Sequence, residues 1–131
     1  MVEKRITDGK RIAQLLASEL EGRDDGELES VAVANADRDV EPTAGGARAY
    51  DVTRGTPSGS DERIARVFVH EDHARLEFSV EPAVAAEAAA DVDLRVRSNE
   101  GETSRTSVLL ESGAAVKRAT DVVQAVVRTH E

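Results

Sequence analysis

Between residues 63 and 80, apolar and polar side chains alternate in two runs that flank the sequence HEDH. Alternation with a period of two is typical of strands that are buried on one face. If Val69 pairs with Ala74, every apolar side chain of one run faces an apolar side chain of the other. The same register places Arg66 opposite Glu77 on the other face. The pattern therefore predicts a β-hairpin with HEDH as its turn.

A second hairpin is predicted further along the chain. Residues 91–98 alternate apolar and polar side chains, and residues 103–110 return as the partner strand. The Asn-Glu-Gly segment between them, residues 99–101, suits a three-residue hairpin loop with glycine in the left-handed position. This loop sets a register in which Val92 meets Val108 on the apolar face.

Helical spacing of apolar residues predicts three helices, over residues 8–21, 82–90 and 112–128. The first can be capped by residue 7 or 8 and the last by residue 112, and the middle one has a proline in its first turn. Val122 lies off the apolar stripe of the last helix, which makes it a candidate to face a partner chain. The stripes are Ile12, Leu16 and Leu20, with Leu15 beside them, in the first helix and Val116, Ala119, Val123, Val126 and Val127 in the last.

Two shorter strands are predicted over residues 28–34 and 48–53, and flexible loops over 37–46 and 53–61, which are rich in Gly, Pro and Ser. The order of elements is α-β-β-β-β-α-β-β-α. Short hairpins favour antiparallel pairing, and each terminal helix has one apolar stripe to bury. We therefore predict a single α+β domain over residues 1–131, a two-layer sandwich of a mainly antiparallel sheet with helices on one face.

With the first strand, residues 28–34, set aside, this order resembles that of the dimeric type III secretion chaperones, which are small acidic proteins of similar length. The resemblance covers the order of elements over most of the chain and includes no sequence motif. It implies a homodimer that binds segments of other proteins. The short middle helix differs from the long dimer helix of that family.

The composition adds a second resemblance. The 131 residues include 26 acidic and 17 basic side chains, for a net charge of −9, and only 3 of the basic residues are lysine. A carboxylate-rich, lysine-poor surface is similar to that of small uncharacterised acidic proteins of halophilic archaea, whose cytoplasm holds molar potassium chloride. Salt at that concentration screens the self-repulsion of the chain. The alternative is an acidic protein encoded by GC-rich DNA.

Several classes of protein are disfavoured by the sequence. The chain has no cysteine, so disulfides and thiolate metal sites are excluded. Its first residues lack the apolar core of a signal peptide, and no apolar run approaches the roughly 20 residues that span a bilayer. The net negative charge argues against nonspecific binding of nucleic acid. We therefore expect a soluble cytoplasmic protein that binds neither membranes nor nucleic acids.

The HEDH segment is the candidate for a metal or acid–base site, since His70 and His73 flank two carboxylates. Zinc requires three or four converging ligands, however, and neighbouring residues of a tight turn point in different directions. His130 has no evident reason to converge with them. The sequence therefore favours a solvated turn whose histidines titrate near neutrality, and it predicts no metal and no cofactor.

Arginines on the polar sides of the two hairpins form the better candidate site. In the predicted register Arg95 lies opposite Arg105, with Arg97 one pleat away, and like charges across a ladder are destabilising unless another group compensates them. If the two hairpins are neighbours, the cluster extends over both. It could then bind phosphate, a carboxylate or an acidic peptide through paired hydrogen bonds. The candidate ligand-binding residues are Arg66, Phe68, Arg75, Arg95, Arg97 and Arg105.

The alternative is that Asp93, Glu77 and Glu102 neutralise these arginines in a surface ion network. No phosphate-binding loop and no nucleophile motif is present, so no catalytic residue is predicted. We predict a non-enzymatic domain that binds another protein or associates with itself, as a homodimer through the sheet edge or the final helix. The competing interpretation is a small-molecule binder or enzyme that uses the arginines on the open sheet face.

Overall fold

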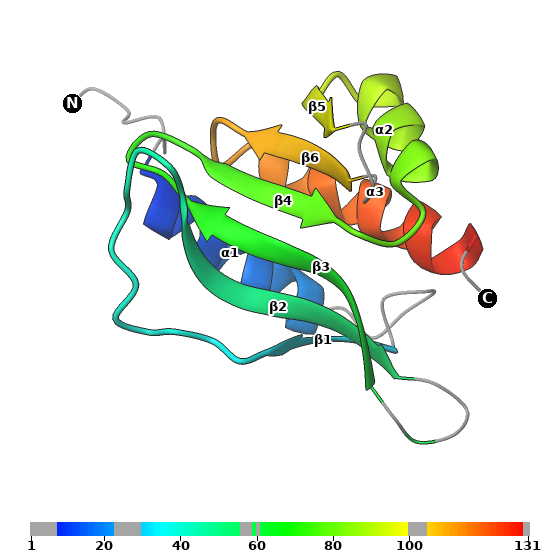
Figure 1. Ribbon diagram of the computed structural model, residues 1–131, viewed down its shortest axis with the longest axis horizontal. Helices are drawn as coiled ribbons and strands as arrows, with labels where there is room; N and C mark the ends of the chain where they lie inside the picture. Colours follow the sequence, from blue (N-terminus) through cyan, green and yellow to red (C-terminus); the bar gives the residue numbers. More distant parts are fainter. Residues whose placement is uncertain (1–7, 23–29, 56–58, 60, 100–104, 130–131) are drawn as a thin grey trace.

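The computed structural model describes residues 8–22, 30–55, 59, 61–99 and 105–129. Six antiparallel strands form one sheet in the order β1-β2-β3-β4-β6-β5, and Figure 1 shows α1 and α3 lying behind the sheet. The predicted α+β class and the predicted order of elements are confirmed. The elements are α1 Gly9–Gly22, β1 Val31–Ala34, β2 Ala47–Gly55, β3 Asp61–Val69, β4 Ala74–Phe78, α2 Pro82–Asp91, β5 Arg95–Asn99, β6 Arg105–Leu110 and α3 Ala115–Thr129.

The β3–β4 hairpin has the predicted register. Val69 pairs with Ala74, and Arg66 lies opposite Glu77. The HEDH segment forms the turn, in which the amide of His70 donates a 2.9 Å hydrogen bond to the carbonyl of His73. Two matched faces and a short loop leave this hairpin only one favourable register.

The predicted register of the second hairpin is wrong by four residues. Arg95 pairs with Leu109 rather than with Arg105, and Val96 rather than Val92 meets Val108. A shift by an even number of residues leaves every side chain on its predicted face, so alternation alone could not detect the error. The predicted Asn-Glu-Gly loop falls partly outside the described residues.

The end of α2 is the reason for this shift. Val92 is the C-cap of the helix, and Asp93 follows in a left-handed conformation with φ of 59°. The amide of Asp93 donates to the carbonyl of Ala90, and that of Leu94 donates to the carbonyl of Ala89. These bonds close the helix in the manner of a Schellman motif. The strand can therefore begin only at Arg95, and the predicted strand start at Asp91 is corrected.

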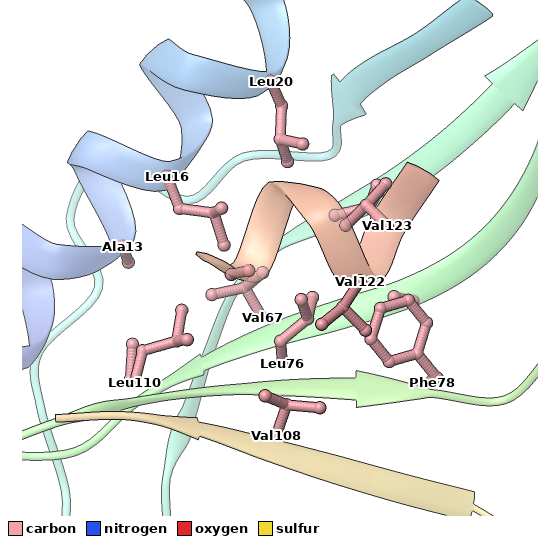
Figure 2. Close-up of a cluster of buried hydrophobic side chains, with 14 of the residues drawn as sticks. Ala13, Leu16, Leu20, Val67, Leu76, Phe78, Val108, Leu110, Val122 and Val123 are labelled. Atoms are coloured by element: carbon pink, nitrogen blue, oxygen red, sulfur yellow. The ribbon is translucent and has the colours of Figure 1, made fainter. Parts of the chain in front are cut away.

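The core fills the space between the sheet and the helices. Figure 2 shows side chains of α1 and α3 pointing toward those of β3, β4 and β6. The predicted inner faces of both terminal helices are buried, and so is Val122, which is fully covered within the chain. The suggestion that Val122 faces a partner chain is therefore wrong, because α3 packs against α1 and α2 as well as the sheet.

The remaining boundaries differ from prediction by a few residues. Asp8 caps α1, since its Oδ1 accepts the amides of Lys10 and Arg11 at 2.9 and 3.2 Å, whereas residue 7 lies outside the described part. The final helix begins at Ala115, after a turn that starts at Ser112. Residues 53–55 and 61, predicted as loop, belong to β2 and β3. The segment 37–46 contains no helix or strand, and its flexibility stays a prediction.

Candidate functional site

One side of the sheet is covered by the helices, and we call the other side the open face. Along β3 and β4, the residues that alternate with the buried core residues point to the open face, and the ladder carries this pattern across β6 and β5. All six predicted ligand-binding residues therefore lie on the open face. Two rows of side chains cross the open face in the strand order β2, β3, β4, β6, β5. The first row is Arg48, Phe68, Arg75, Leu109 and Arg95, and the second is Asp51, Arg66, Glu77, Ser107 and Arg97. Arg105 lies on β6, two residues before Ser107.

Pairing of β4 with β6 joins the two hairpins into this single surface. Arg75 faces Leu109 across that ladder, and Glu77 faces Ser107. The condition that the sequence left open, that the hairpins are neighbours, is thereby met. The predicted repulsion between Arg95 and Arg105 is absent, however, because these residues are not opposite each other.

Glu77 is the central acceptor of the open face. Its Oε2 accepts a 2.8 Å hydrogen bond from Nη1 of Arg75, and its Oε1 lies 3.4 Å from Nη1 of Arg105. The side chain of Glu77 is only 13% exposed, so the carboxylate is held between two guanidinium groups and largely shielded from water. These charge-assisted contacts are stronger than contacts between neutral groups.

Two further carboxylates pair with arginines at the rim. Oδ1 of Asp51 lies 3.6 Å from Nη1 of Arg48, and Oε1 of Glu111 lies 3.6 Å from Nε of Arg95. The last pair is exposed on both sides, so it contributes little free energy. The expected ion network is thus present in part: Glu77 belongs to it, Asp93 makes no ion pair within the described part of the chain, and Glu102 lies outside that part.

Arg66 and Arg97 remain without a carboxylate partner among the described residues. They lie in the same row, separated by Glu77 of β4 and Ser107 of β6. With strands about 4.8 Å apart, three strand spacings place their backbones roughly 14 Å from each other. Arg66 is half-buried and Arg97 is exposed. Among the six arginines named on the open face, these two guanidinium groups are the ones most available to an anion.

Apolar side chains lie beneath the arginines. The guanidinium carbon of Arg75 is 4.2 Å from the centre of the Phe68 ring, a cation–π contact. Leu109 is only 5% exposed although it lies on the open face, between Arg75 and Arg95 in the register. Long arginine side chains can cover apolar surface while their charged ends stay in water. The arginine side chains therefore shield apolar residues of this face from water and also give the face its positive charge.

Sequence analysis missed Arg48, which lies on the open face opposite Phe68. Simple alternation along β2 would place Arg48 on the same side as Tyr50. An irregularity in the register between these two residues reverses that relation, so that Tyr50 points to the helices and Arg48 away from them. No pattern in the sequence signalled this bulge.

The two histidines of the HEDH turn stack on each other. Their ring centroids are 4.2 Å apart, and the ring planes differ by 8°. Nδ1 of His70 lies 3.1 Å from the carbonyl oxygen of Ala44, and Nε of Arg75 donates to Nε2 of His70 at 3.3 Å. Both nitrogens of His70 are thus engaged. Within the described residues, no group of three or more ligand side chains gathers to hold a metal ion.

Two pKa values are shifted at this turn. Burial lowers the pKa of His70, and the charges of His73 and Arg75 add to the effect, against the opposing influence of the Ala44 carbonyl and of Asp72. The hydrogen bond from His73 lowers the pKa of the exposed Asp72 carboxyl. His70 is therefore held in its neutral form around physiological pH.

Two cavities lie on the helix side of the molecule. One of about 350 Å³ is lined by residues of α1, of β2 and of the loop after β1, and one of about 330 Å³ lies between α1 and the start of α3. Neither is lined by an arginine of the open face. Within the part of the chain that the structure describes, each helix is too short or too polar to cross a lipid bilayer.

The fold and this surface define the class: an α+β domain with one helix-covered and one open, arginine-bearing sheet face. The family model for the family of unknown function DUF7993 matches residues 1–131, so the chain belongs to that family. Comparison with curated proteins and with solved structures found no significant match. The resemblance to type III secretion chaperones therefore has no support beyond the order of elements.

Proposed function

We propose that the protein is a non-enzymatic binding domain whose open face binds an acidic segment of a protein partner. The observation that carries the proposal is the gathering of six arginines at neighbouring positions of one sheet face in a chain of net charge −9. Asp51, Glu77 and Glu111 pair with four of them. Two of the six have no carboxylate partner among the described residues, and local positive charge of this kind attracts and orients an anionic partner.

Carboxylate is the anion that the face is best suited to bind. Glu77 already lies between the guanidinium groups of Arg75 and Arg105, at 2.8 and 3.4 Å. The planar fork of arginine matches the two oxygens of a carboxylate. An acidic side chain of a partner can form the same contact with Arg66 or Arg97, which have no carboxylate partner among the described residues.

The shape of the face favours an extended partner over a small molecule. Arg66 and Arg97 are roughly 14 Å apart by strand spacing, a distance that about four residues of an extended peptide span. A single small anion could not contact both. An acidic peptide that crosses the strands could do so.

The same face is less suited to bind a nucleic acid than an acidic peptide. Single strands are held by bases that stack on free aromatic rings, in addition to contacts with phosphates. The face offers Phe68, whose ring already carries the guanidinium group of Arg75. The overall negative charge would also repel the continuous charge of a phosphate backbone.

The composition supports a salt-rich working medium, and we place the protein in the cytoplasm of a halophilic archaeon on that ground. The Debye length falls to about 3 Å at 1 M salt, so only groups in direct contact interact strongly. Binding in such a medium requires close pairing of arginine with carboxylate rather than long-range attraction. The prediction is that binding of an acidic peptide weakens with salt yet persists at 1 M potassium chloride.

The proposal is tested with a fluorescein-labelled peptide of twelve glutamates and with Arg66→Ser/Arg97→Ser. Fluorescence anisotropy should show about a tenfold loss of affinity in this variant, since two contacts worth roughly 0.5–1 kcal/mol each are removed. Neither residue forms an ion pair with another described residue, so the melting temperature should change little.

The matched control is Arg11→Ser/Arg38→Ser, which alters the net charge equally on the helix side, where both residues are exposed. Its affinity should stay within about twofold of the wild type. Equal losses in the two variants would mean that net charge alone governs binding, and the open face would then not be the site. Tighter binding of a twelve-nucleotide oligouridylate than of the peptide would also overturn the proposal.

Self-association is the second form that binding could take, because the acidic surface of another copy could occupy the open face. The predicted homodimer remains a proposal, and the sheet edges at β1 and β5 are where it could form. Light scattering of the wild type and of Arg66→Ser/Arg97→Ser measures it. A dimer that persists in the variant would lie at an edge rather than on the open face.

A further inference from the structure

The protonation state of His70 follows from its two hydrogen-bond partners. The carbonyl of Ala44 can only accept, so Nδ1 of His70 must carry the proton of their 3.1 Å contact. The guanidinium group of Arg75 can only donate, so Nε2 of His70 must be the acceptor of their 3.3 Å contact. His70 is therefore the neutral tautomer with its proton on Nδ1.

A second proton on His70 would break the contact with Arg75. Nε2 would then be a donor facing another donor, and a positive charge would face the guanidinium group. The other groups around His70 offer partial compensation. His73 stacks on it, Asp72 lies in the same turn, and Glu77 is already paired with Arg75. The loop 43–46 brings no ionisable side chain to the ring.

The surroundings hold His70 and Arg75 at this close distance. Gly46 has φ of +91°, and a Cβ atom there would lie 2.8 Å from Nε2 of His70 and 3.0 Å from Nη2 of Arg75. Only glycine lets the loop approach the pair so closely. On the other side, Gly9 at the start of α1 packs against the carbonyl groups of His70 and His73. These contacts fix the backbone of the turn and leave no room for a side chain at position 46 beside the pair.

Arg75 links this pair to the open face. The same guanidinium group that contacts His70 lies over Phe68 and donates to Glu77. Arg48 lies in the same row on the other side of Phe68. An anion that binds beside Arg75 would therefore add negative charge close to His70.

We propose that binding of an anionic group at Arg75 is coupled to uptake of a proton by His70. This inference rests on the proposed function, because it concerns the same face and names the carboxylate as the group that brings the charge. The anion compensates the second positive charge and takes the guanidinium group away from Nε2. The open face is then a pH-dependent site that binds acidic partners more tightly in a mildly acidic medium.

The direction of the pH effect follows from linkage. The free protein holds His70 neutral, since burial lowers its pKa below the ordinary value of about 6.5. Bound anion raises that pKa, so the complex holds more protons than the free protein at pH values between the lowered pKa of the free protein and the raised pKa of the complex. Affinity must therefore rise as the pH falls. Glutamate side chains of a peptide, with a pKa near 4.3, stay ionised between about pH 5.5 and 7.5.

The test compares wild type, His70→Gln and His73→Gln with the glutamate peptide at pH 5.5 and 7.5. Glutamine at position 70 can keep an acceptor for Arg75 but cannot titrate. Wild type should bind about threefold to tenfold more tightly at pH 5.5, within the roughly hundredfold that full uptake of one proton over two pH units would allow. His73→Gln should keep most of this ratio and His70→Gln should lose it. An equal ratio in wild type and His70→Gln would overturn the inference.

A second measurement separates this inference from the proposed function. Sulfate keeps its charge between pH 5.5 and 7.5, so NMR titration of the His70 ring with and without sulfate reports the coupling directly. A higher His70 pKa in sulfate than in chloride of equal ionic strength supports the coupling even if the peptide does not bind, which would refute only the proposed function. An unchanged pKa refutes the coupling whatever the peptide does.

Discussion

The two faces of the sheet shield their apolar side chains from water in different ways. The covered face is built from small and medium apolar residues that the helices hide from water, as Figure 2 shows. The open face has no helix over it within the described residues and relies on arginine side chains, which lie over Phe68 and beside Leu109. Each face holds one of the two phenylalanines of the chain, Phe78 on the covered and Phe68 on the open side.

Because of this difference, most of the stability comes from the covered face, and the open face is left available for binding. Burial of apolar area contributes roughly 25 cal/mol per Å², and most of that area lies on the covered face. Exposed ion pairs contribute little to stability, with a median near 0–1 kcal/mol. The open face can therefore change its residues at small cost in stability, which is the property expected of a binding surface.

The largest expected effect comes from comparing the two phenylalanines. Phe78→Ala should lower the free energy of unfolding by about 3–5 kcal/mol, because it leaves a cavity in a fully buried cluster. Phe68→Ala should cost about 1 kcal/mol, because it removes mainly the cation–π contact with Arg75. Urea denaturation in the same buffer measures both. Similar losses would show that the open face is part of the core.

A smaller effect is expected from Glu77→Gln. The substitution leaves Arg75 and Arg105 without their shared carboxylate, and we expect a loss of about 1–2 kcal/mol because the pair is partly shielded from water. The affinity for the glutamate peptide should rise in the same variant, since two arginines lose an internal competitor. Thermal denaturation and anisotropy measure the two changes.

Glu111→Gln is the control for that variant. The Arg95–Glu111 pair is exposed, so stability should change by less than about 0.5 kcal/mol. A weaker affinity of Glu77→Gln for the peptide would contradict the view that this carboxylate occupies part of the site.

A further small effect concerns the one tyrosine of the chain. The hydroxyl group of Tyr50 donates a 2.7 Å hydrogen bond to the carbonyl of Ala13, and Tyr50→Phe should cost about 1 kcal/mol. Burial raises the pKa of Tyr50 far above its ordinary value, and the charge of Glu21 adds to this. Its contribution to stability is therefore complete below about pH 10 and declines above it.

An alkaline titration followed at 295 nm checks this expectation. Tyrosinate absorbance should appear only together with loss of circular dichroism, as the protein unfolds. Ionisation near pH 10 in a folded protein would show that the covered face admits water at Tyr50.

Much of the fold could be predicted because two requirements acted together. In the β3–β4 hairpin, apolar residues match on one face and Arg66 meets Glu77 on the other, so a single register satisfies both. In the β5–β6 pair, a shift of four residues kept the same faces, and only the helix end at Asp93 excluded the predicted register. Alternation identifies the face of a residue but not its partner.

Some features of the candidate site could be predicted from the sequence and others could not. The placement of Arg66, Arg75 and Arg95 on one face followed from alternation, and the joining of the hairpins was stated as a condition. Arg48 was missed because the bulge beside it reverses its face. The contact of Arg75 with His70 could not be foreseen either, since it depends on how closely the loop at Gly46 approaches.

The sequence by itself determined on which face most residues of the β3–β4 hairpin and of the terminal helices lie, and in what order the elements occur, because these depend on local periodicity and on the cost of exposing apolar side chains. Tertiary structure alone decided that β4 pairs with β6 and that, of the six arginines named on the open face, four share three carboxylates while two have no carboxylate partner among the described residues. Those outcomes depend on distances between segments remote in the chain, which are set by packing of the helices and by the ends of the strands.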